Sequence, residues 1–218
     1  MRPIIKICGL MREEDARMCA SHGADILGFV VEYPNPVPWN LDIQAARELI
    51  ARIPAPAKSC VVTGGAREHI MRVATQTKPD YIQLHCGESL KDTTYLVNAL
   101  GEQGIKIIKT LFPNTPGLEQ AAADFCAAGV YALLFDPRTP DNAANGGLAD
   151  ISAFLRLKQA ASCPVILAGG INPENIAGFI CKVRPEIIDL MTGVEQSPGI
   201  KDEAKVAALF RYNSKLAS

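Results

Sequence analysis

The sequence predicts an α/β fold in which eight strands and eight helices alternate and the strands close into a (β/α)8 barrel. Three observations support this. Eight short apolar runs recur along the 218 residues, segments with helical spacing separate them, and no linker-like or low-complexity stretch divides the chain. Eight units in this length average about 27 residues each, near the lower limit for such a barrel. We therefore expect residues 1–218 to form a single compact domain.

The predicted strands are short and nearly continuous in apolar, often β-branched residues. This pattern is typical of parallel strands that are buried on both faces. Because helical segments separate them, we expect the strands to run parallel to one another. In chain order they cover residues 4–8, 26–31, 59–62, 81–85, 105–109, 132–136, 165–168 and 187–191.

The predicted helices carry apolar residues at spacings of three and four, as amphipathic helices do. Asn172-Pro173-Glu174 is typical of a helix start, with Asn172 as the N-cap and Pro173 in the first helical position. The helices are expected over 13–22, 42–52, 67–75, 90–100, 118–127, 151–158, 173–182 and 202–212.

An open doubly wound sheet is the alternative architecture. Such a sheet usually carries a glycine-rich G-x-G-x-x-G fingerprint directly after its first strand. Here the first predicted strand ends in Cys8-Gly9-Leu10, without that fingerprint. The barrel is therefore the favoured interpretation.

The composition excludes several functional classes. An apolar fraction of 48% argues against disorder, and 22 basic against 23 acidic residues leave no footprint for nucleic acid. No apolar run approaches the roughly 20 residues that span a bilayer, and the N-terminus lacks the apolar core of a signal peptide. We expect a cytoplasmic protein with neither nucleic acid nor membrane as a partner, acting as a monomer or a homodimer.

The seven cysteines are dispersed and form no C-x-x-C pair, which argues against zinc or thioredoxin-like sites and leaves no predicted metal site. Cysteines in a reducing compartment usually behave as small buried hydrophobes. Apart from Cys8, we expect that role for the other six: Cys19, Cys60, Cys86, Cys126, Cys163 and Cys181.

In a barrel of this kind the active site lies at the C-terminal ends of the strands. Cys8, His85, Lys109 and Asp136 are expected at such ends. The last two predicted strands lead into glycine-bearing loops: Gly169-Gly170 and Thr192-Gly193. Glycines let the backbone approach a ligand and helix starts present N–H groups, so these loops predict a phosphate site, with tight packing as the alternative.

Cys8 and Asp136 could form an acid–base pair. A thiol facing the mouth can be ionised by nearby positive dipoles and then act as a general base. A carboxyl group in apolar surroundings, here after Leu133-Leu134-Phe135, can stay protonated and act as an acid. The alternatives are a core thiol at Cys8 and a cap or loop organiser at Asp136.

Several motifs follow one another in the order seen in the phosphoribosylanthranilate isomerase family, which the chain resembles over nearly its whole length. The most specific are Lys6-Ile7-Cys8-Gly9-Leu10 near the start and the Gly-Val-Glu-x-x-Pro-Gly-x-Lys-Asp pattern of residues 193–202. The others are residues 23–30, Gln83-Leu84-His85, Leu133-Leu134-Phe135-Asp136 and residues 164–175.

The resemblance implies a cofactor-free TIM barrel of tryptophan biosynthesis. Such an enzyme converts N-(5-phosphoribosyl)anthranilate to 1-(o-carboxyphenylamino)-1-deoxyribulose 5-phosphate by an Amadori rearrangement. Carried over by position, Cys8 would take the C2 proton and Asp136 would protonate the ring oxygen. The phosphate would bind at Gly169, Gly170, Thr192 and Gly193, and we add His85 and Arg138 as substrate-binding candidates.

Four places depart from the family pattern. Residues 33–40 lack the arginine that usually follows Ser-Pro, and Cys86 stands where the family has glycine after the histidine. Residues 146–149 read Gly-Gly-Leu-Ala instead of Gly-Gly-Thr-Gly, and residues 191–193 read Met-Thr-Gly instead of Ser-Ser-Gly. An arginine fork on a carboxylate is not easily replaced. A solvated loop arginine is the favoured interpretation of Arg138, which is also the candidate replacement for the missing arginine.

Three hypotheses follow from these residues. The first is a working phosphoribosylanthranilate isomerase with a rearranged substrate loop. The second is a relative that acts on another phosphorylated sugar. The third is a barrel without catalytic activity that binds a ligand or a partner protein. The presence of both Cys8 and Asp136 favours an enzyme, and we adopt the first hypothesis.

Overall fold

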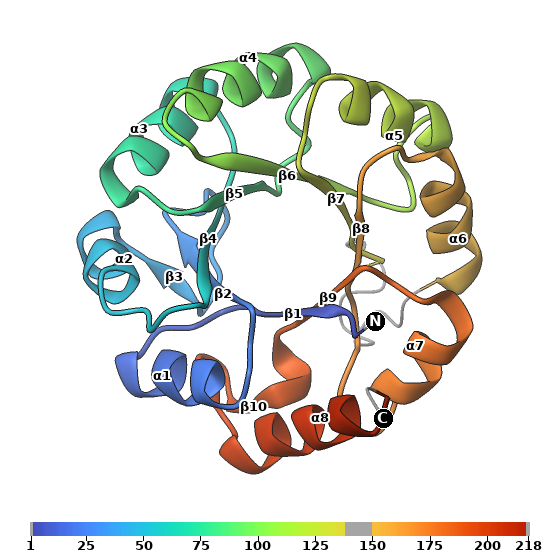
Figure 1. Cartoon of the computed structure of the whole chain (residues 1–218). Coiled ribbons are helices and arrows are strands. Elements are labelled where there is room, and N and C mark those ends of the chain that lie inside the picture. The colour runs from blue at the N-terminus through green and yellow to red at the C-terminus, as the bar shows by residue number, and fades with distance from the viewer. Residues whose placement is uncertain (1, 138–149, 217–218) are drawn as a thin grey trace.

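The computed structural model contains a closed barrel of eight parallel strands with helices around it, as the sequence predicts (Figure 1). It describes residues 2–137 and 150–216. Pairing of the first barrel strand with both the second and the last closes the ring. The barrel strands are β1 (Ile4–Ile7), β2 (Ile26–Val31), β4 (Lys58–Thr63), β5 (Tyr81–Leu84), β6 (Lys106–Leu111), β7 (Ala132–Phe135), β8 (Val165–Leu167) and β9 (Ile187–Leu190).

The helices form the outer layer, with their apolar faces against the strands. None of those in the described ranges is long and apolar enough to cross a membrane. Asp42, Ser89 and Asp150 cap three of them by accepting backbone N–H groups. The helices are α1 (Glu13–Ser21), α2 (Ile43–Ile50), α3 (Arg67–Thr77), α4 (Leu90–Gly101), α5 (Leu118–Ala127), α6 (Ile151–Ala160), α7 (Ile176–Val183) and α8 (Glu203–Leu216).

The predicted start of α7 is wrong. The helix begins at Ile176 rather than Pro173. The Asn172 side chain accepts the N–H groups of Glu174 and Asn175, so it caps a turn that precedes the helix. The turn lengthens the loop after β8.

Short elements that the sequence did not predict lie near the C-terminal ends of the barrel strands. The two-residue strand β3 (Asn40–Leu41) pairs with β2 and anchors the end of the 33–40 loop. A single 3-10 turn, η2 (Thr192–Val194), follows β9. It leads into the antiparallel hairpin of β10 (Glu195–Ser197) and β11 (Ile200–Lys201), which contains most of the motif of residues 193–202.

The barrel interior changes from apolar to polar toward the C-terminal ends of the strands. Its apolar part includes Ile26, Cys60, Tyr81, Ile108, Leu134 and Ile166. Side chains alternate between the two faces of a strand. Two residues further along three of these strands, the interior side chains are therefore Gln83, Thr110 and Asp136, all buried. The fold thus places polar chemistry at one end of the barrel.

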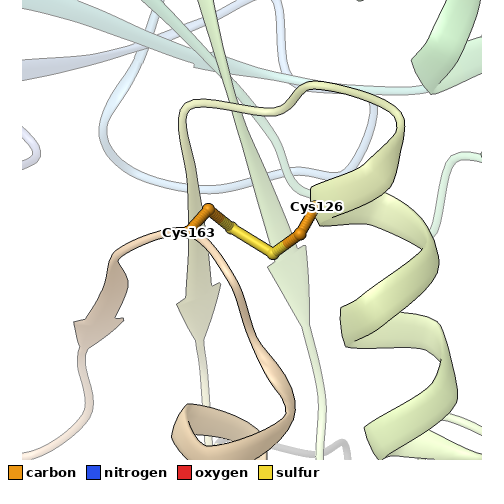
Figure 2. Close-up of a disulfide and its surroundings, with 2 residues drawn as sticks. All are labelled: Cys126 and Cys163. Atoms are coloured by element: carbon orange, nitrogen blue, oxygen red, sulfur yellow. A yellow bond between two sulfur atoms is a disulfide. The ribbon is translucent and has the colours of Figure 1, made fainter.

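Cysteine use differs from the prediction. Cys126, near the end of α5, and Cys163, in the turn before β8, form a disulfide with a Cα–Cα distance of 5.7 Å (Figure 2). Cys181 is exposed and Cys86 is half-buried. Of the six expected packing residues, only Cys19 and Cys60 are fully buried free thiols. The prediction failed because spacing along the chain does not show which loops meet at the N-terminal end of the barrel.

Candidate active site

Cys8 directly follows β1 and faces the barrel interior, where only 4% of the residue is exposed. It contacts Val30 and Val62. Gly28, on the neighbouring strand, makes room for it, because a Cβ at that position would lie 2.8 Å from the Cys8 Sγ. The fold therefore builds a close-fitting site for this thiol.

The loop of residues 33–40 covers Cys8. Tyr33, Val37 and Trp39 pack against the apolar cluster around the thiol. The loop is held at both sides, because the Tyr33 hydroxyl donates to the His85 carbonyl at 3.2 Å and Trp39 Nε1 donates to Glu195 Oε1 at 2.9 Å. This part of the mouth is consequently apolar and shielded from water.

Two buried charges lie next to Cys8. Lys6, two residues earlier on the same face of β1, forms an ion pair with Asp189 of β9, with Nζ 2.8 Å from Oδ2. Burial raises the pKa of the Cys8 thiol, and the Asp189 carboxylate adds to this, while Lys6 and Lys201 oppose it. Desolvation is the dominant effect on this thiol and the ammonium of Lys6 is the main counteracting charge, so the ionisation of Cys8 by its surroundings stays a prediction.

Asp136 directly follows β7 and is 1% exposed. Its Oδ2 lies 3.4 Å from Nε2 of His85, the residue that directly follows β5. The His85 Nδ1 contacts the amide nitrogen of Gln83 at 3.2 Å and the hydroxyl of Thr110 at 3.0 Å. With the Gln83 amide nitrogen as the donor to Nδ1, the ring proton would lie on Nε2, facing Asp136.

The loops after β8 and β9 lie against each other. Gly169 and Gly170 have φ angles of 96° and 62°, a region that favours glycine. Gly193 is required for close approach, because a Cβ there would lie 1.9 Å from the carbonyl oxygen of Ile171. The η2 turn begins at Thr192, and the first N–H groups of such a turn have no partner within it. Two adjacent backbone segments of this kind suit an anion.

Other sequence candidates have different outcomes. Lys109 does not end its strand, because β6 continues to Leu111. Its side chain points to the helix layer, where Nζ lies 2.7 Å from Glu88 Oε2, so the expectation of a place in the mouth is wrong. Arg138 and residues 146–149 lie outside the described residues.

Sequence reasoning missed the charged residues that support the mouth. Lys6 and Asp189 form one buried pair, and Glu195 and Lys201 form another, with Lys201 Nζ 2.9 Å from Glu195 Oε1. A signal existed for three of them, since Lys6, Glu195 and Lys201 lie in the two specific motifs. Within residues 2–137 and 150–216, no three histidine, cysteine or acidic side chains come together as metal ligands would.

The barrel order places the candidate groups around one opening. β9 and β8 lie between β1, which carries Cys8, and β7, which carries Asp136. The two glycine-bearing loops therefore lie between the thiol and the carboxyl group. This arrangement can hold a phosphorylated ligand at one end, with a base on one side and an acid on the other.

Comparisons with known proteins agree on one family. The model of the N-(5'-phosphoribosyl)anthranilate (PRA) isomerase family matches residues 5–212. The isomerase of Methanopyrus kandleri is 33% identical over 216 residues, covering 95% of this chain and 96% of that protein. The isomerase of Bordetella pertussis is 32% identical over 215 residues, covering 96% of this chain and 94% of that protein.

Solved structures agree with the sequence relatives. The phosphoribosyl anthranilate isomerase of Thermus thermophilus superposes with a TM-score of 0.82 at 30% identity, covering 99% of this chain and 100% of that one. An isomerase in complex with reduced 1-(o-carboxyphenylamino)-1-deoxyribulose 5-phosphate gives a TM-score of 0.79 at 27% identity, with the same coverage.

Proposed function

The chain belongs to the N-(5'-phosphoribosyl)anthranilate isomerase family, and we propose that it converts N-(5-phosphoribosyl)anthranilate to 1-(o-carboxyphenylamino)-1-deoxyribulose 5-phosphate in tryptophan biosynthesis. The observation that carries this proposal is the placement of Cys8 and Asp136. They follow β1 and β7, and the loops after β8 and β9 lie between them. An Amadori rearrangement of a sugar phosphate requires a base, an acid and a phosphate site in this relation.

The acid step falls to Asp136. Its carboxyl proton goes to the furanose ring oxygen as the C1–O bond breaks, and the nitrogen lone pair forms a C1=N bond that carries positive charge. His85 lies 3.4 Å from Asp136 and has a side chain 16% exposed, against 1% for the carboxyl group. The imidazole thus connects a buried acid with the solvent side of the mouth.

The base step falls to Cys8. The cationic C1=N group acidifies the C2–H bond. Cys8 takes the proton, the C–H electron pair forms a C1=C2 bond, and the π pair of the C1=N bond returns to nitrogen. The enolamine becomes the ketone when C1 gains a proton and the C2 hydroxyl loses one. If Cys8 returns its proton to C1 and Asp136 accepts the hydroxyl proton, both groups regain their starting states.

Different parts of the site bind the phosphate end and the anthranilate end of the substrate. Backbone groups at Gly169, Gly170, Thr192 and Gly193 hold the phosphate, with little help from side-chain charge. The anthranilate ring lies toward the apolar 33–40 loop, and Arg138 binds its carboxylate. The lack of an arginine within 33–40 is the one observation that favours another phosphorylated sugar as the alternative substrate.

The cellular setting follows from the pathway. We place the enzyme in the cytoplasm, with residues 1–218 as one barrel domain and a small phosphorylated molecule, rather than nucleic acid, as its ligand. A net charge of -1 is in keeping with this, because nucleic-acid binding requires a basic surface.

Complementation tests the proposal. A bacterial strain that lacks this isomerase is given the gene and grown without tryptophan. We expect growth with the wild-type protein and with Cys181→Ser, which changes an exposed thiol. We expect no growth with Cys8→Ser or Asp136→Asn expressed to the same level. Absence of growth with abundant, folded wild-type protein would contradict the proposal.

A further inference from the structure

The mechanism above does not use the buried ion pair of Lys6 and Asp189, which lies beside Cys8. Lys6 is 0% exposed, although lysine is among the residues least often fully buried. The two residues are register partners on β1 and β9, and their side chains meet at 2.8 Å inside the barrel.

Packing alone does not account for this pair. Replacing a buried ion pair by apolar residues is often neutral or stabilising, and the interior directly below is filled with residues such as Ile26, Ile108 and Leu134. The second carboxylate oxygen, Asp189 Oδ1, is buried without a hydrogen-bond partner among the described residues. A pair with a purely structural role would be expected to satisfy both oxygens.

Within the described residues, charged and titratable groups act on Cys8 from several elements. Lys6 lies on the same strand, Cys60 on β4, Asp189 on β9 and Lys201 on β11. Lys6 has the largest opposing effect on the raised pKa of Cys8, because its ammonium charge lies on the same face of the chain two residues earlier. Lys6 is therefore the main group that favours the thiolate.

We propose that Lys6, held by Asp189, is a positioning residue that makes the buried Cys8 thiol competent as a base. This inference rests on the proposed role of Cys8. The Lys6 ammonium donates to the sulfur as the thiolate forms, and it keeps its own proton throughout. Without that cation, a thiolate in this apolar part of the mouth would be balanced chiefly by Lys201, whose opposing effect is smaller.

Asp189 keeps Lys6 charged. Burial works against a charged lysine, but the Asp189 carboxylate, together with Cys8 and Cys60, raises the pKa of Lys6 above its ordinary value. The pair therefore favours an ammonium group at Lys6. The pair acts as a fixed charge whose position is set by the β1–β9 register.

The chain contains a matched control. Lys109 and Glu88 form a second buried pair with an Nζ–Oε2 distance of 2.7 Å and side chains 2% exposed. It lies outside the barrel, where the Lys109 Nζ is 5.5 Å from the centre of the Phe125 ring of α5. Burial lowers the pKa of Lys109, against the effect of Glu88. This pair has the same chemistry as Lys6–Asp189 but does not face Cys8.

The test titrates the Cys8 thiol in four folded proteins. These are the wild type, Lys6→Met, Lys6→Met/Asp189→Asn, and the control Lys109→Met/Glu88→Gln. Thiolate absorbance near 240 nm is recorded against pH for each, and the same protein carrying Cys8→Ser is subtracted. The double variants remove both charges of a pair, so that neither leaves a buried unpaired charge that could prevent folding.

We expect Lys6→Met/Asp189→Asn to raise the midpoint of Cys8 ionisation by about one pH unit, which is tenfold less thiolate at a given pH. The pH profile of kcat/KM should shift with it, and kcat should fall while KM changes little. Lys6→Met should shift the midpoint further if it folds. The control pair should leave the Cys8 midpoint unchanged.

An unshifted midpoint in the Lys6 double variant would overturn the inference and leave the pair with a structural role only. An equal shift in the control variant would overturn it as well, because the effect would then be general. The titration needs no substrate, so it remains decisive even if the wild type fails to convert phosphoribosylanthranilate. That failure would count against the proposed function instead.

Discussion

The two sides of the barrel mouth give Cys8 and Asp136 opposite surroundings. On the side of β1, Cys8 lies under the apolar side chains of Val37 and Trp39, with a fixed ion pair beside it. On the side of β7, Asp136 contacts His85, which is partly exposed and held by polar neighbours. The proposed base, Cys8, is shielded from water, whereas the proposed acid, Asp136, contacts a partly exposed imidazole.

This difference explains how one opening can hold a base and an acid at the same pH. Burial raises the pKa of the Cys8 thiol, so a proton taken from carbon is held strongly once it arrives. In the proposed cycle Asp136 gives its proton to the ring oxygen and regains one from the C2 hydroxyl, and an imidazole that reaches toward solvent can re-establish the protonated starting state. We expect a fixed charge to activate Cys8 and proton exchange with solvent to maintain Asp136. The following experiments test this difference.

The largest effect is expected on the buried side. Cys8→Ser replaces the thiol by a hydroxyl that is far harder to ionise, so kcat should fall by at least about 10²-fold, the usual scale for such groups. Steady-state kinetics with phosphoribosylanthranilate provides the measurement, with Cys181→Ser as the control. Turnover near the wild-type value would show that Cys8 is not the base.

A comparable loss is expected on the solvent-linked side. Asp136→Asn keeps the shape of the side chain but removes the transferable proton, and kcat should fall by at least about 10²-fold. KM should change little, because the phosphate loops are untouched. If the variant turned over normally, another group would have to protonate the ring oxygen.

The pH dependence of kcat/KM should report the ionisation of Cys8. Because the pKa of Cys8 is raised, the thiolate is a small fraction of the thiol at neutral pH. At pH values below the midpoint, this fraction rises about tenfold for each unit by which the pH increases. We expect kcat/KM to rise with pH through the range above the ordinary thiol value of about 8.5. A profile that is already flat between pH 6 and 8 would contradict a raised thiol pKa.

A smaller effect on activity is expected from a change in the loops after β8 and β9, which lie between Cys8 and Asp136. Gly193→Ala would bring a Cβ to 1.9 Å from the Ile171 carbonyl and push the two phosphate loops apart. KM should rise about tenfold, equivalent to about 1.4 kcal/mol of binding, with a smaller change in kcat. Gly178→Ala, which meets no atom within 4 Å, is the control. An unchanged KM in the Gly193 variant would place the phosphate elsewhere.

The smallest effect on activity is expected at the opposite end of the barrel. Cys126→Ser/Cys163→Ser should leave kcat unchanged but lower the unfolding free energy by about 2–4 kcal/mol, since the bond closes a loop between residues 37 apart in sequence. Thermal unfolding with and without a reductant gives the comparison. A Tm equal to that of the oxidised wild type would mean that the bond contributes nothing to stability.

The sequence predicted the barrel and the places of Cys8, His85 and Asp136 because parallel strands bring their C-terminal ends to one rim. It misplaced Lys109, because a strand longer by two residues, together with the alternation of side chains, puts that residue on the outer face. It also misplaced the start of α7, where Asn172 stabilises a turn instead of the helix.

Long-range pairings could not be read from local patterns. The Lys6–Asp189 pair joins residues 183 apart, and it depends on the register of the first and last barrel strands. The Cys126–Cys163 bond depends on where α5 ends relative to β8. The apolar cover over Cys8 depends on how loop 33–40 is anchored by Trp39 and Tyr33. All three require the closed barrel before they can be seen.

The most direct test is an assay of the purified protein with freshly prepared phosphoribosylanthranilate, followed by the loss of the substrate's fluorescence. We expect loss that is proportional to enzyme concentration and yields 1-(o-carboxyphenylamino)-1-deoxyribulose 5-phosphate, and that is abolished in Cys8→Ser and Asp136→Asn alike. A rate indistinguishable from buffer at high concentrations of folded wild-type protein would contradict the account.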